Sequence, residues 1–349
     1  MNASSDTFMR RAVDLSRHGF PAPNPRVGCV IVRDGVVVGE GYHDHAGGPH
    51  AEVVALDAAG EKARGADLYC TLEPCDHHGR TPPCTQAIIA SEVARVFVAE
   101  EDPNPKAAGG TATLRAAGVE CHLGLLRGEA ERANETFLFA HRNGRPFVTV
   151  KVAVTTDGFI ARPDGESKWI TGERAREEAH RMRAEMGCVL VGANTVEIDD
   201  PLLTARVPGV VNQPVPVVLD PHARIGADKN VLQREGVLRF VAAGSATRKS
   251  DVELKTQEGM FETRAVLTEL AKRGIIGVLV EGGGETIASF LRAGLVDRVE
   301  RFVSRTAFGD GKYWLGANPP KFDLPLVGTA EFGDDLLETY GTSAGRQRS

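Results

Sequence analysis

The chain has 349 residues and a formal net charge of −6, with 42% hydrophobic and 25% charged residues. This length predicts about two domains, and the composition is that of a globular protein with enough apolar side chains for sizeable cores. The negative charge argues against nucleic acid or an anionic membrane surface as a partner, although a phosphorylated ligand could still bind through local basic groups.

The N-terminal stretch MNASSDTFMRRAVDLSRHG contains no apolar core of a signal peptide, and no apolar run in the chain is long enough to span a bilayer. We therefore expect a cytoplasmic protein whose six cysteines are reduced. In that compartment a close cysteine pair more often binds a metal or takes part in catalysis than forms a disulfide.

Strands and helices alternate along the first part of the chain. The expected elements are a helix over 6–18, a hairpin over 27–41 that turns at Asp34-Gly35, a helix over 50–65, a strand over 66–74, a helix over 84–93, a strand over 94–105, and a helix and a strand within 110–126. This alternation predicts a three-layer α/β domain with a mixed sheet. The polar stretch AHRNGRP, residues 140–146, predicts a domain boundary, which gives domains of residues 1–145 and 146–349.

A second alternation follows the boundary. The expected elements are strands over 147–161, 188–193, 215–220 and 237–243, helices over 172–187 and 264–274, and a strand, glycine turn and helix within 275–295. Residues 203–215 and 243–260 are expected to be loops. The second domain is therefore also expected to be α/β.

The stretches GPHAEVVAL and TLEPCDHHGRTPPCTQA carry the most specific signal in the first domain. His50, Cys75 and Cys84 supply one imidazole and two thiolates, which suit Zn²⁺ and leave its fourth tetrahedral position free for water. Cys84 follows two prolines at an expected helix start, where the helix dipole stabilises a thiolate. Glu52, two residues after His50, is placed to carry a proton from the water to a leaving amine.

This order of residues matches the zinc-deaminase signature, in which the glutamate is not a ligand. The second spacing departs from that signature, because eight residues rather than two separate Cys75 from Cys84. By itself, a His-x-Glu sequence usually lies on a solvated helix face, and a pair of cysteines usually belongs to the hydrophobic core. The other four cysteines, Cys29, Cys70, Cys121 and Cys188, have no polar motif around them, and for these the alternative of buried apolar thiols stays open.

The segments PNPRVGCVIV, GYHDHAGGPHAEVVAL, TLEPCDHHGRTPPC and EDPNP closely resemble the deaminase half of the bifunctional riboflavin-biosynthesis enzymes. The resemblance implies a cytidine-deaminase-like domain with one Zn²⁺. It implies hydrolytic removal of ammonia from 2,5-diamino-6-ribosylamino-4(3H)-pyrimidinone 5′-phosphate. The positions that it implies for the substrate are Asn24, His43, His77, Arg80, Asp102 and Asn104. Turn chemistry is the alternative for Asn24 and Asn104, since each precedes a proline.

In the second domain, VLVEGGGETIASFL reads as a strand, a glycine turn and a helix start that could hold a phosphate. By itself it is only a βα turn, and it is not a G-x-G-x-x-G fingerprint. With KVAVTTDGFIA, GESKWITG and NTVEIDDPLLTAR, however, it resembles the reductase half of the same enzymes, which is similar to dihydrofolate reductase. The resemblance implies that NADPH reduces the ribosyl group of the deaminated intermediate, 5-amino-6-ribosylaminouracil 5′-phosphate, to ribityl.

The resemblance also implies a set of binding positions in this domain. For the cofactor they are Ala153, Trp169, Thr195, Asp199, Gly283, Gly284, Glu285, Thr286, Ile287, Ala288 and Ser289. For the substrate they are Ser167, Arg183, Leu203, Arg206 and Glu281, to which we add Lys151 as a hypothetical group that polarises the sugar. A solvated helix face is the alternative for Arg183, and a packed aromatic ring is the alternative for Trp169.

The chain departs from the family pattern at Thr155-Thr156, at Pro221, at Gly284-Glu285 and after residue 300. A glutamate in a phosphate-binding turn repels the ligand unless it points away. An alternative is therefore a deaminase whose second domain binds a ligand without chemistry. Two further alternatives are a nucleic-acid deaminase, which the net charge disfavours, and a structural-zinc or regulatory protein, which would need a fourth protein ligand. The family resemblance also suggests a homodimer or homotetramer.

Overall fold

The computed structural model describes residues 3–79, 82–167 and 169–342. The chain divides into two compact units, Met1–Asn143 and Gly144–Ser349. Both units are α/β, as the alternation of expected strands and helices predicts. Within the described residues, no helix has the length and apolar character needed to cross a membrane.

The first unit contains five strands and six α-helices among its described residues. They are α1 (Ala3–Ser16), β1 (Gly28–Arg33), β2 (Val36–Tyr42), α2 (Ala51–Ala59), β3 (Asp67–Leu72), α3 (Cys84–Ala90), β4 (Arg95–Glu100), α4 (Gly110–Ala116), β5 (Glu120–Leu123), α5 (Arg127–Ala133) and α6 (Glu135–Asn143), with a short 3₁₀ helix at Gly60–Ala63. Asp34 and Gly35 both have positive φ, of 52° and 78°, which is the backbone of the two-residue hairpin turn predicted there.

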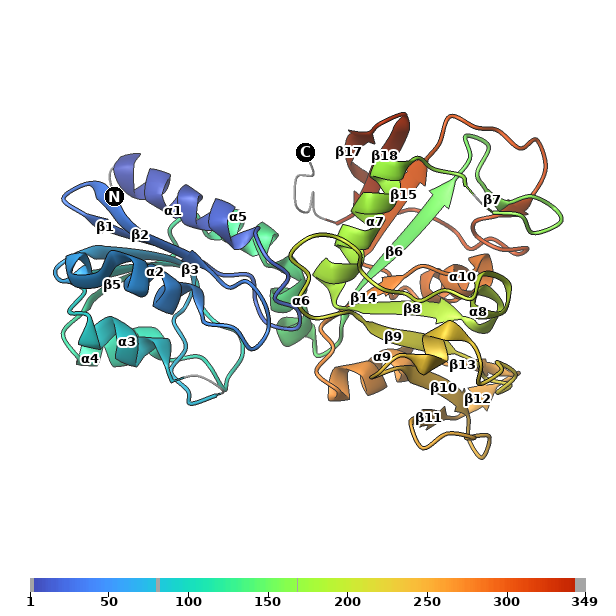
Figure 1. The fold of residues 1–349 in the computed structure, drawn as a ribbon, viewed down its shortest axis with the longest axis horizontal. Coiled ribbons are helices and arrows are strands. Elements are labelled where there is room, and N and C mark those ends of the chain that lie inside the picture. The colour runs from blue at the N-terminus through green and yellow to red at the C-terminus, as the bar shows by residue number, and fades with distance from the viewer. Residues whose placement is uncertain (1–2, 80–81, 168, 343–349) are drawn as a thin grey trace. The chain divides into compact units, whose positions relative to one another are not determined.

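The sheet of the first unit has the order β2-β1-β3-β4-β5 and is mixed. β1 is antiparallel to β2 and β3, whereas β3, β4 and β5 run parallel. Helices cover both faces, with α1 and α5 on one side and α2, α3 and α4 on the other (Figure 1). This is the predicted three-layer arrangement, and Cys75, a candidate metal ligand, comes three residues after the end of β3.

The second unit is built on a larger sheet. Its elements are β6 (Phe147–Val154), β7 (Phe159–Ala161), α7 (Glu173–Met186), β8 (Cys188–Gly192), α8 (Ala193–Asp199), β9 (Val215–Leu219), β10 (Leu238–Ala242), β11 (Asp251–Leu254), β12 (Thr256–Gln257), β13 (Met260–Phe261), α9 (Thr263–Lys272), β14 (Gly277–Val280), α10 (Gly284–Arg292), β15 (Arg298–Val303), β16 (Lys312–Tyr313), β17 (Leu326–Phe332) and β18 (Asp335–Gly341), with a 3₁₀ helix at Asn230–Gln233.

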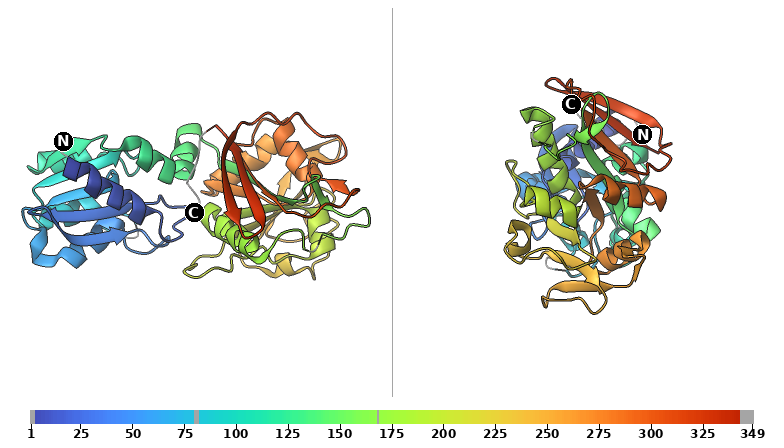
Figure 2. Two further views of the ribbon diagram at one scale, coloured as in Figure 1. Left: turned by 90° about the horizontal axis from the view of Figure 1, so that it is seen from above. Right: turned by 90° about the vertical axis from the view of Figure 1, so that its right-hand side faces the viewer.

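Its main sheet has the order β11-β10-β9-β8-β14-β6-β15-β18-β17. The strands from β11 to β15 run parallel, and the hairpin of β17 and β18 adds an antiparallel end, drawn in red in Figure 2. One face packs against α9 and α10 through a core that includes Leu190 and Phe290, and the other packs against α8 through Val191 and Val196. Side chains alternate between these two cores along β8, as expected for a strand buried on both faces.

Several expected elements differ from the structure. Residues 140–143 of the predicted boundary segment belong to the end of α6, and the expected loop 243–260 contains β11 and β12. The expected strand 147–161 is interrupted at residues 155–158, where Gly158 has a φ of +86°. The helices α5, α6 and α8 and the four strands after residue 297 were not predicted, because short elements of this kind carry weak periodic signals.

Candidate metal centre and ligand cavity

Three predicted ligands meet in the first unit. Nδ1 of His50 and Sγ of Cys75 and Cys84 all lie within 4.8 Å of one another. His50 directly precedes α2, Cys75 follows β3, and Cys84 is the first residue of α3. The imidazole Nδ1 is 3.2 Å from the sulfur of Cys84 and 3.5 Å from that of Cys75, so it faces both thiols.

The chemistry of this donor set fits a zinc ion. Hydrogen bonds from the Cys84 thiol and from His50 lower the pKa of Cys75 to about 4, despite its burial. The thiolate beside it, together with burial, raises the pKa of Cys84. A bound cation would take the place of the shared proton, since zinc binds cysteine as the thiolate. In the described part of the chain, no fourth histidine, cysteine or carboxylate joins the cluster.

Glu52 lies in the first turn of α2 and is 3% exposed. Burial raises its pKa to about 6, and the nearby His50 only partly opposes this effect. A carboxyl group with such a pKa can both take up and release a proton near neutral pH. It is the group most suited to proton transfer beside the three ligands.

Asn24 and His43 form a hydrogen-bonded pair next to the cluster. Nδ1 of His43 is 2.9 Å from the carbonyl oxygen of Pro49, which can only accept, so Nδ1 carries the hydrogen. Nε2 of the neutral ring then accepts from the side-chain amide of Asn24 at 3.0 Å. Burial lowers the pKa of His43, and its ring lies 5.3 Å from that of His50. The side chain of Asn24 is therefore held in one orientation by His43. Asn24 also belongs to a turn, in which its backbone N–H donates to the carbonyl oxygen of Pro21.

The other predicted deaminase positions have different surroundings. Nδ1 of His77 is buried and has no hydrogen-bond partner within the described protein. Burial raises the pKa of Asp102 to about 6, and its Oδ1 accepts the backbone N–H of Asn104 at 2.8 Å. The side-chain oxygen of Asn104 accepts the N–H of Lys106 at 3.2 Å, so this residue does have the turn role considered for it. Arg80 lies outside the described residues.

The second unit contains a cavity of ≈ 1350 Å³ at the carboxyl ends of its parallel strands. Its lining includes Ala153 of β6, Gly192 of β8 and Leu219 of β9, and Glu281 follows β14. Ligands of α/β proteins commonly bind at this edge of the sheet. The volume exceeds the roughly 300–1,000 Å³ of a typical small-molecule pocket and leaves room for two ligands side by side.

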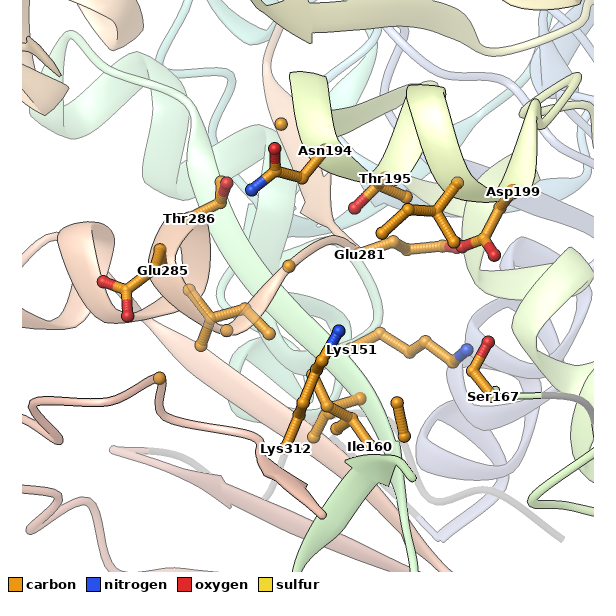
Figure 3. A pocket seen from close by; sticks show the side chains of 18 of the residues that line it. Lys151, Ile160, Ser167, Asn194, Thr195, Asp199, Glu281, Glu285, Thr286 and Lys312 are labelled. Atoms are coloured by element: carbon orange, nitrogen blue, oxygen red, sulfur yellow. The ribbon is translucent and has the colours of Figure 1, made fainter. Parts of the chain in front are cut away.

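The floor of the cavity carries an ion pair and a neighbouring lysine. Arg183 donates to both carboxylate oxygens of Glu281 at 2.7 Å, and its remaining terminal nitrogen donates to the carbonyl of Thr204 at 3.0 Å. The guanidinium lowers the pKa of Glu281 to about 2, although burial acts in the opposite direction. Burial lowers the pKa of Lys151, whose chain extends along the floor toward Ser167 (Figure 3). The solvated helix face considered for Arg183 is therefore wrong.

Two glycine turns bring α8 and α10 close together at the cavity. A Cβ on Gly192 would lie 2.5 Å from the hydroxyl of Thr286, and one on Gly282 would lie 2.8 Å from that of Thr195. The hydroxyls of Thr195 and Thr286 and the carboxylate of Asp199 consequently line the wall (Figure 3). Only glycine permits this close approach of the two turns.

Glu285 points away from the cluster of Lys151, Ser167 and Glu281 (Figure 3). Its carboxylate accepts the N–H of Ala317 at 3.0 Å and lies 3.7 Å from Arg292. These contacts hold the carboxylate on the side of Arg292 and Ala317, so it does not project toward the floor of the cavity. The side chain instead connects the first turn of α10 to the segment after β16.

Most of the predicted reductase positions line this cavity. They are Lys151, Ala153, Ser167, Trp169, Arg183, Thr195, Asp199, Arg206, Glu281, Gly283, Gly284, Glu285, Thr286, Ile287 and Ser289. Trp169 is 73% exposed under the guanidinium of Arg176, so the packed ring considered for it is wrong. Leu203 and Ala288 are not part of the wall: Leu203 is buried in the core beside α8, and Ala288 is fully buried.

Several charged side chains and histidines of the cavity wall were not predicted from the sequence, namely Arg176, His180, His222, Arg224, Arg292 and Lys312. Arg176 and His180 lie seven and three residues before Arg183 on α7, and this spacing places them on the same helix face. That spacing could have identified both. Lys312 comes from β16, which pairs with β7, and no local pattern indicates this pairing.

Two family models match the chain. Residues 2–100 match the cytidine and deoxycytidylate deaminase zinc-binding region, and residues 146–337 match the RibD C-terminal domain. The riboflavin biosynthesis protein RibD of Aquifex aeolicus is 44% identical over 87% of this chain and 88% of its own length. For RibD of Escherichia coli K12 the identity is 39%, over 86% and 88%.

Solved structures agree with these matches. RibD of Acinetobacter baumannii superimposes with a TM-score of 0.86 at 36% identity, over 97% of this chain and 98% of the other. A diaminohydroxyphosphoribosylaminopyrimidine deaminase/5-amino-6-(5-phosphoribosylamino)uracil reductase from Thermotoga maritima gives 0.84 at 37%, over 96% and 98%. Together with the two domains and their sites, these likenesses show that the chain belongs to the RibD family of bifunctional deaminase/reductase enzymes of riboflavin biosynthesis.

Proposed function

We propose that the first unit is a zinc-dependent hydrolase that acts on 2,5-diamino-6-ribosylamino-4(3H)-pyrimidinone 5′-phosphate. It would replace the 2-amino group by oxygen and release ammonia. The convergence of His50, Cys75 and Cys84 beside buried Glu52 carries this proposal. When bound, Zn²⁺ supplies Lewis acidity that lowers the pKa of a water molecule to about 7.

Glu52 is the proposed proton carrier of the deamination. As a carboxylate it takes a proton from the attacking water, and as a carboxylic acid it delivers a proton to the departing amine. Its pKa of about 6, which burial raises, supports both steps because each form is accessible near neutral pH.

The substrate would be held by the residues around this centre. Asn24, fixed by neutral His43, can hydrogen-bond to a ring edge. The buried Nδ1 of His77 lacks a protein partner and is available to a ligand. We also assign Asp102 and Asn104 to the substrate, and Arg80 to its phosphate.

We infer that the second unit reduces the ribosyl group of the deaminated intermediate to ribityl with NADPH. Bound NADPH would supply the hydride for C1′ of the sugar. The two glycine turns, with Thr195, Asp199, residues 283–287 and Ser289, form a wall that suits its phosphates and sugars. Exposed Trp169 offers a flat surface for a ring. Ala153 completes the cofactor positions along β6.

The intermediate would lie over the charged floor. Lys151 is positioned to donate a proton to the sugar oxygen as the ring opens, and burial, which lowers its pKa, favours that transfer. Glu281 keeps lone pairs for sugar hydroxyls while it pairs with Arg183. Because the nitrogens of Arg183 have protein partners, exposed Arg206 and half-buried Ser167 are the groups most open to the phosphate.

One variant and one coupled assay test the whole proposal. Glu52→Gln should bind one zinc ion per chain and release no ammonia from the diaminopyrimidine, whereas NADPH oxidation with the deaminated intermediate should be unchanged. Ammonia release by Glu52→Gln would refute the assignment of Glu52. Absence of NADPH oxidation by the wild-type chain would favour the alternative of a deaminase with a non-catalytic second unit.

A further inference from the structure

His180 projects from α7 into the wall of the reductase cavity, three residues before Arg183. Its Nδ1 lies 2.9 Å from the carbonyl oxygen of Thr204. A carbonyl oxygen can only accept, so Nδ1 is the protonated nitrogen of the ring. The same carbonyl accepts from Arg183 at 3.0 Å, which fixes the segment before Arg206 against α7.

The second ring nitrogen is then an acceptor. Burial and the positive charges of Arg183 and Arg206 lower the pKa of His180 to about 4, so the ring is neutral at physiological pH. The contacts of the ring with the Thr204 carbonyl, at 2.9 Å, and with a terminal nitrogen of Arg183, at 3.5 Å, are both at Nδ1, and Nε2 has no hydrogen-bond partner within the described protein. The ring therefore presents one hydrogen-bond acceptor to a wall whose other groups are mostly donors, and a ligand that displaces water from Nε2 must supply a donor in its place.

We propose that Nε2 of His180 accepts a hydrogen bond from a hydroxyl group of the sugar phosphate, which makes His180 a further substrate-binding residue. The inference rests on the proposed reductase function and names one more contact within it. A sugar phosphate carries its hydroxyls a few atoms from the phosphate. With the phosphate near Arg206, a hydroxyl can reach the neighbouring imidazole, whereas the phosphate oxygens themselves would be repelled by the lone pair.

Two replacements of His180 distinguish the contributions of its two ring nitrogens. The amide nitrogen of asparagine takes the place of Nδ1 and can keep the bond to Thr204, while the position of Nε2 is lost. The longer glutamine side chain places its amide near Nε2 and gives up the bond to Thr204. His18→Asn is a matched control, because His18 also directs Nδ1 to a main-chain carbonyl, that of Leu15, but lies in the first unit.

The measurements are the steady-state KM and kcat for the deaminated intermediate, the Kd for NADPH, and calorimetric binding of ribose 5-phosphate. We expect His180→Asn to raise the KM and the ribose 5-phosphate Kd by about 3- to 10-fold, the effect of one neutral hydrogen bond, with the NADPH Kd unchanged. His180→Gln should recover part of that loss, and His18→Asn should match the wild type.

An unchanged KM in His180→Asn would overturn the proposal. Calorimetry in buffers of different ionisation enthalpy gives a second test: uptake of a proton that accompanies binding of ribose 5-phosphate in the wild type but not in His180→Asn would show that His180 becomes a cationic donor to phosphate, which also overturns it. A wild-type chain without NADPH oxidation would instead count against the proposed reductase function, while the ribose 5-phosphate titrations would still test His180.

Discussion

Arg183 and Glu281 form a bidentate ion pair on the floor of the reductase cavity, with both N···O distances at 2.7 Å. The side chains are 16% and 8% exposed, so neither charge is well solvated. The charge of each side chain is therefore stabilised mainly by the other, and both charges act on the nearby Lys151. A change in this ion pair should therefore affect both the free energy of unfolding of the second unit and the charge on the floor of the cavity.

Glu281→Gln should destabilise the second unit by about 3 kcal/mol, because it leaves the Arg183 guanidinium without its counter-charge. Both tryptophans of the chain, Trp169 and Trp314, lie in this unit, so urea unfolding followed by tryptophan fluorescence reports on it alone. The KM for the deaminated intermediate should rise as well.

Asp297→Asn is the matched control for that variant. Asp297 pairs with Arg145 in the same bidentate way, also at 2.7 Å, but does not line the cavity. We expect a comparable loss of stability with an unchanged KM. Equal changes of KM in the two variants would mean that the Glu281 effect is only structural.

Replacement of single cysteines should separate the metal ligands from the packed thiols. Cys75→Ala and Cys84→Ala each remove one of three protein donors, so we expect the zinc content to fall well below one ion per chain. Cys121→Ala, at a half-buried thiol outside the cluster, should keep the full content. Elemental analysis of the purified chains measures it, and full zinc in Cys75→Ala would contradict the assignment.

The metal cluster could be predicted from the sequence because its residues lie in short, recognisable motifs. His50 and Glu52 are two residues apart, and each cysteine sits beside an element boundary that proline marks. The positions of the reductase cavity were readable only through resemblance to a family. Even then, Leu203 and Ala288 turned out to be buried away from the wall, because the direction of a side chain depends on tertiary packing.

Contacts between segments far apart in the chain were not predictable. The partner of Arg183 is Glu281, and the partner of Glu285 is the backbone of Ala317. Neither pair has a local signature, since each forms only when the sheet and the segment after β16 are in place. The antiparallel end of the sheet, β17 and β18, was missed for a related reason: its strands are half exposed and have mixed polarity.

The stability of the second unit should fall as the pH decreases through the range in which His180 becomes charged. Its pKa is lowered from 6.5 to about 4 in the folded chain. A depressed pKa contributes stability that is fully present above the unfolded value and is lost progressively as the pH falls from about 6.5 toward 4. Urea unfolding of the wild type and His180→Asn, monitored by tryptophan fluorescence at pH 7.5 and pH 5, compares the two.

We expect the free energy of unfolding of the wild type, relative to His180→Asn, to be lower at pH 5 than at pH 7.5. Other groups titrate in both proteins, so their effects cancel in this difference. A difference that is independent of pH, or one that grows on acidification, would show that His180 is not held neutral by burial and the two arginines.

Glu285 offers a test of the turn that is proposed to hold the cofactor. Its carboxylate accepts the N–H of Ala317 and faces away from the floor of the cavity. Removal of its charge should therefore not strengthen phosphate binding, despite its position in the first turn of α10.

Glu285→Gln, which keeps an acceptor oxygen, should leave the NADPH Kd within about twofold, the size of a weak exposed electrostatic effect. Glu285→Ala removes the acceptor for Ala317 and should weaken NADPH binding if the segment after β16 shapes the cavity. Titration of NADPH against the two variants measures both, and tenfold tighter binding by Glu285→Gln would show that the carboxylate faces the phosphates after all.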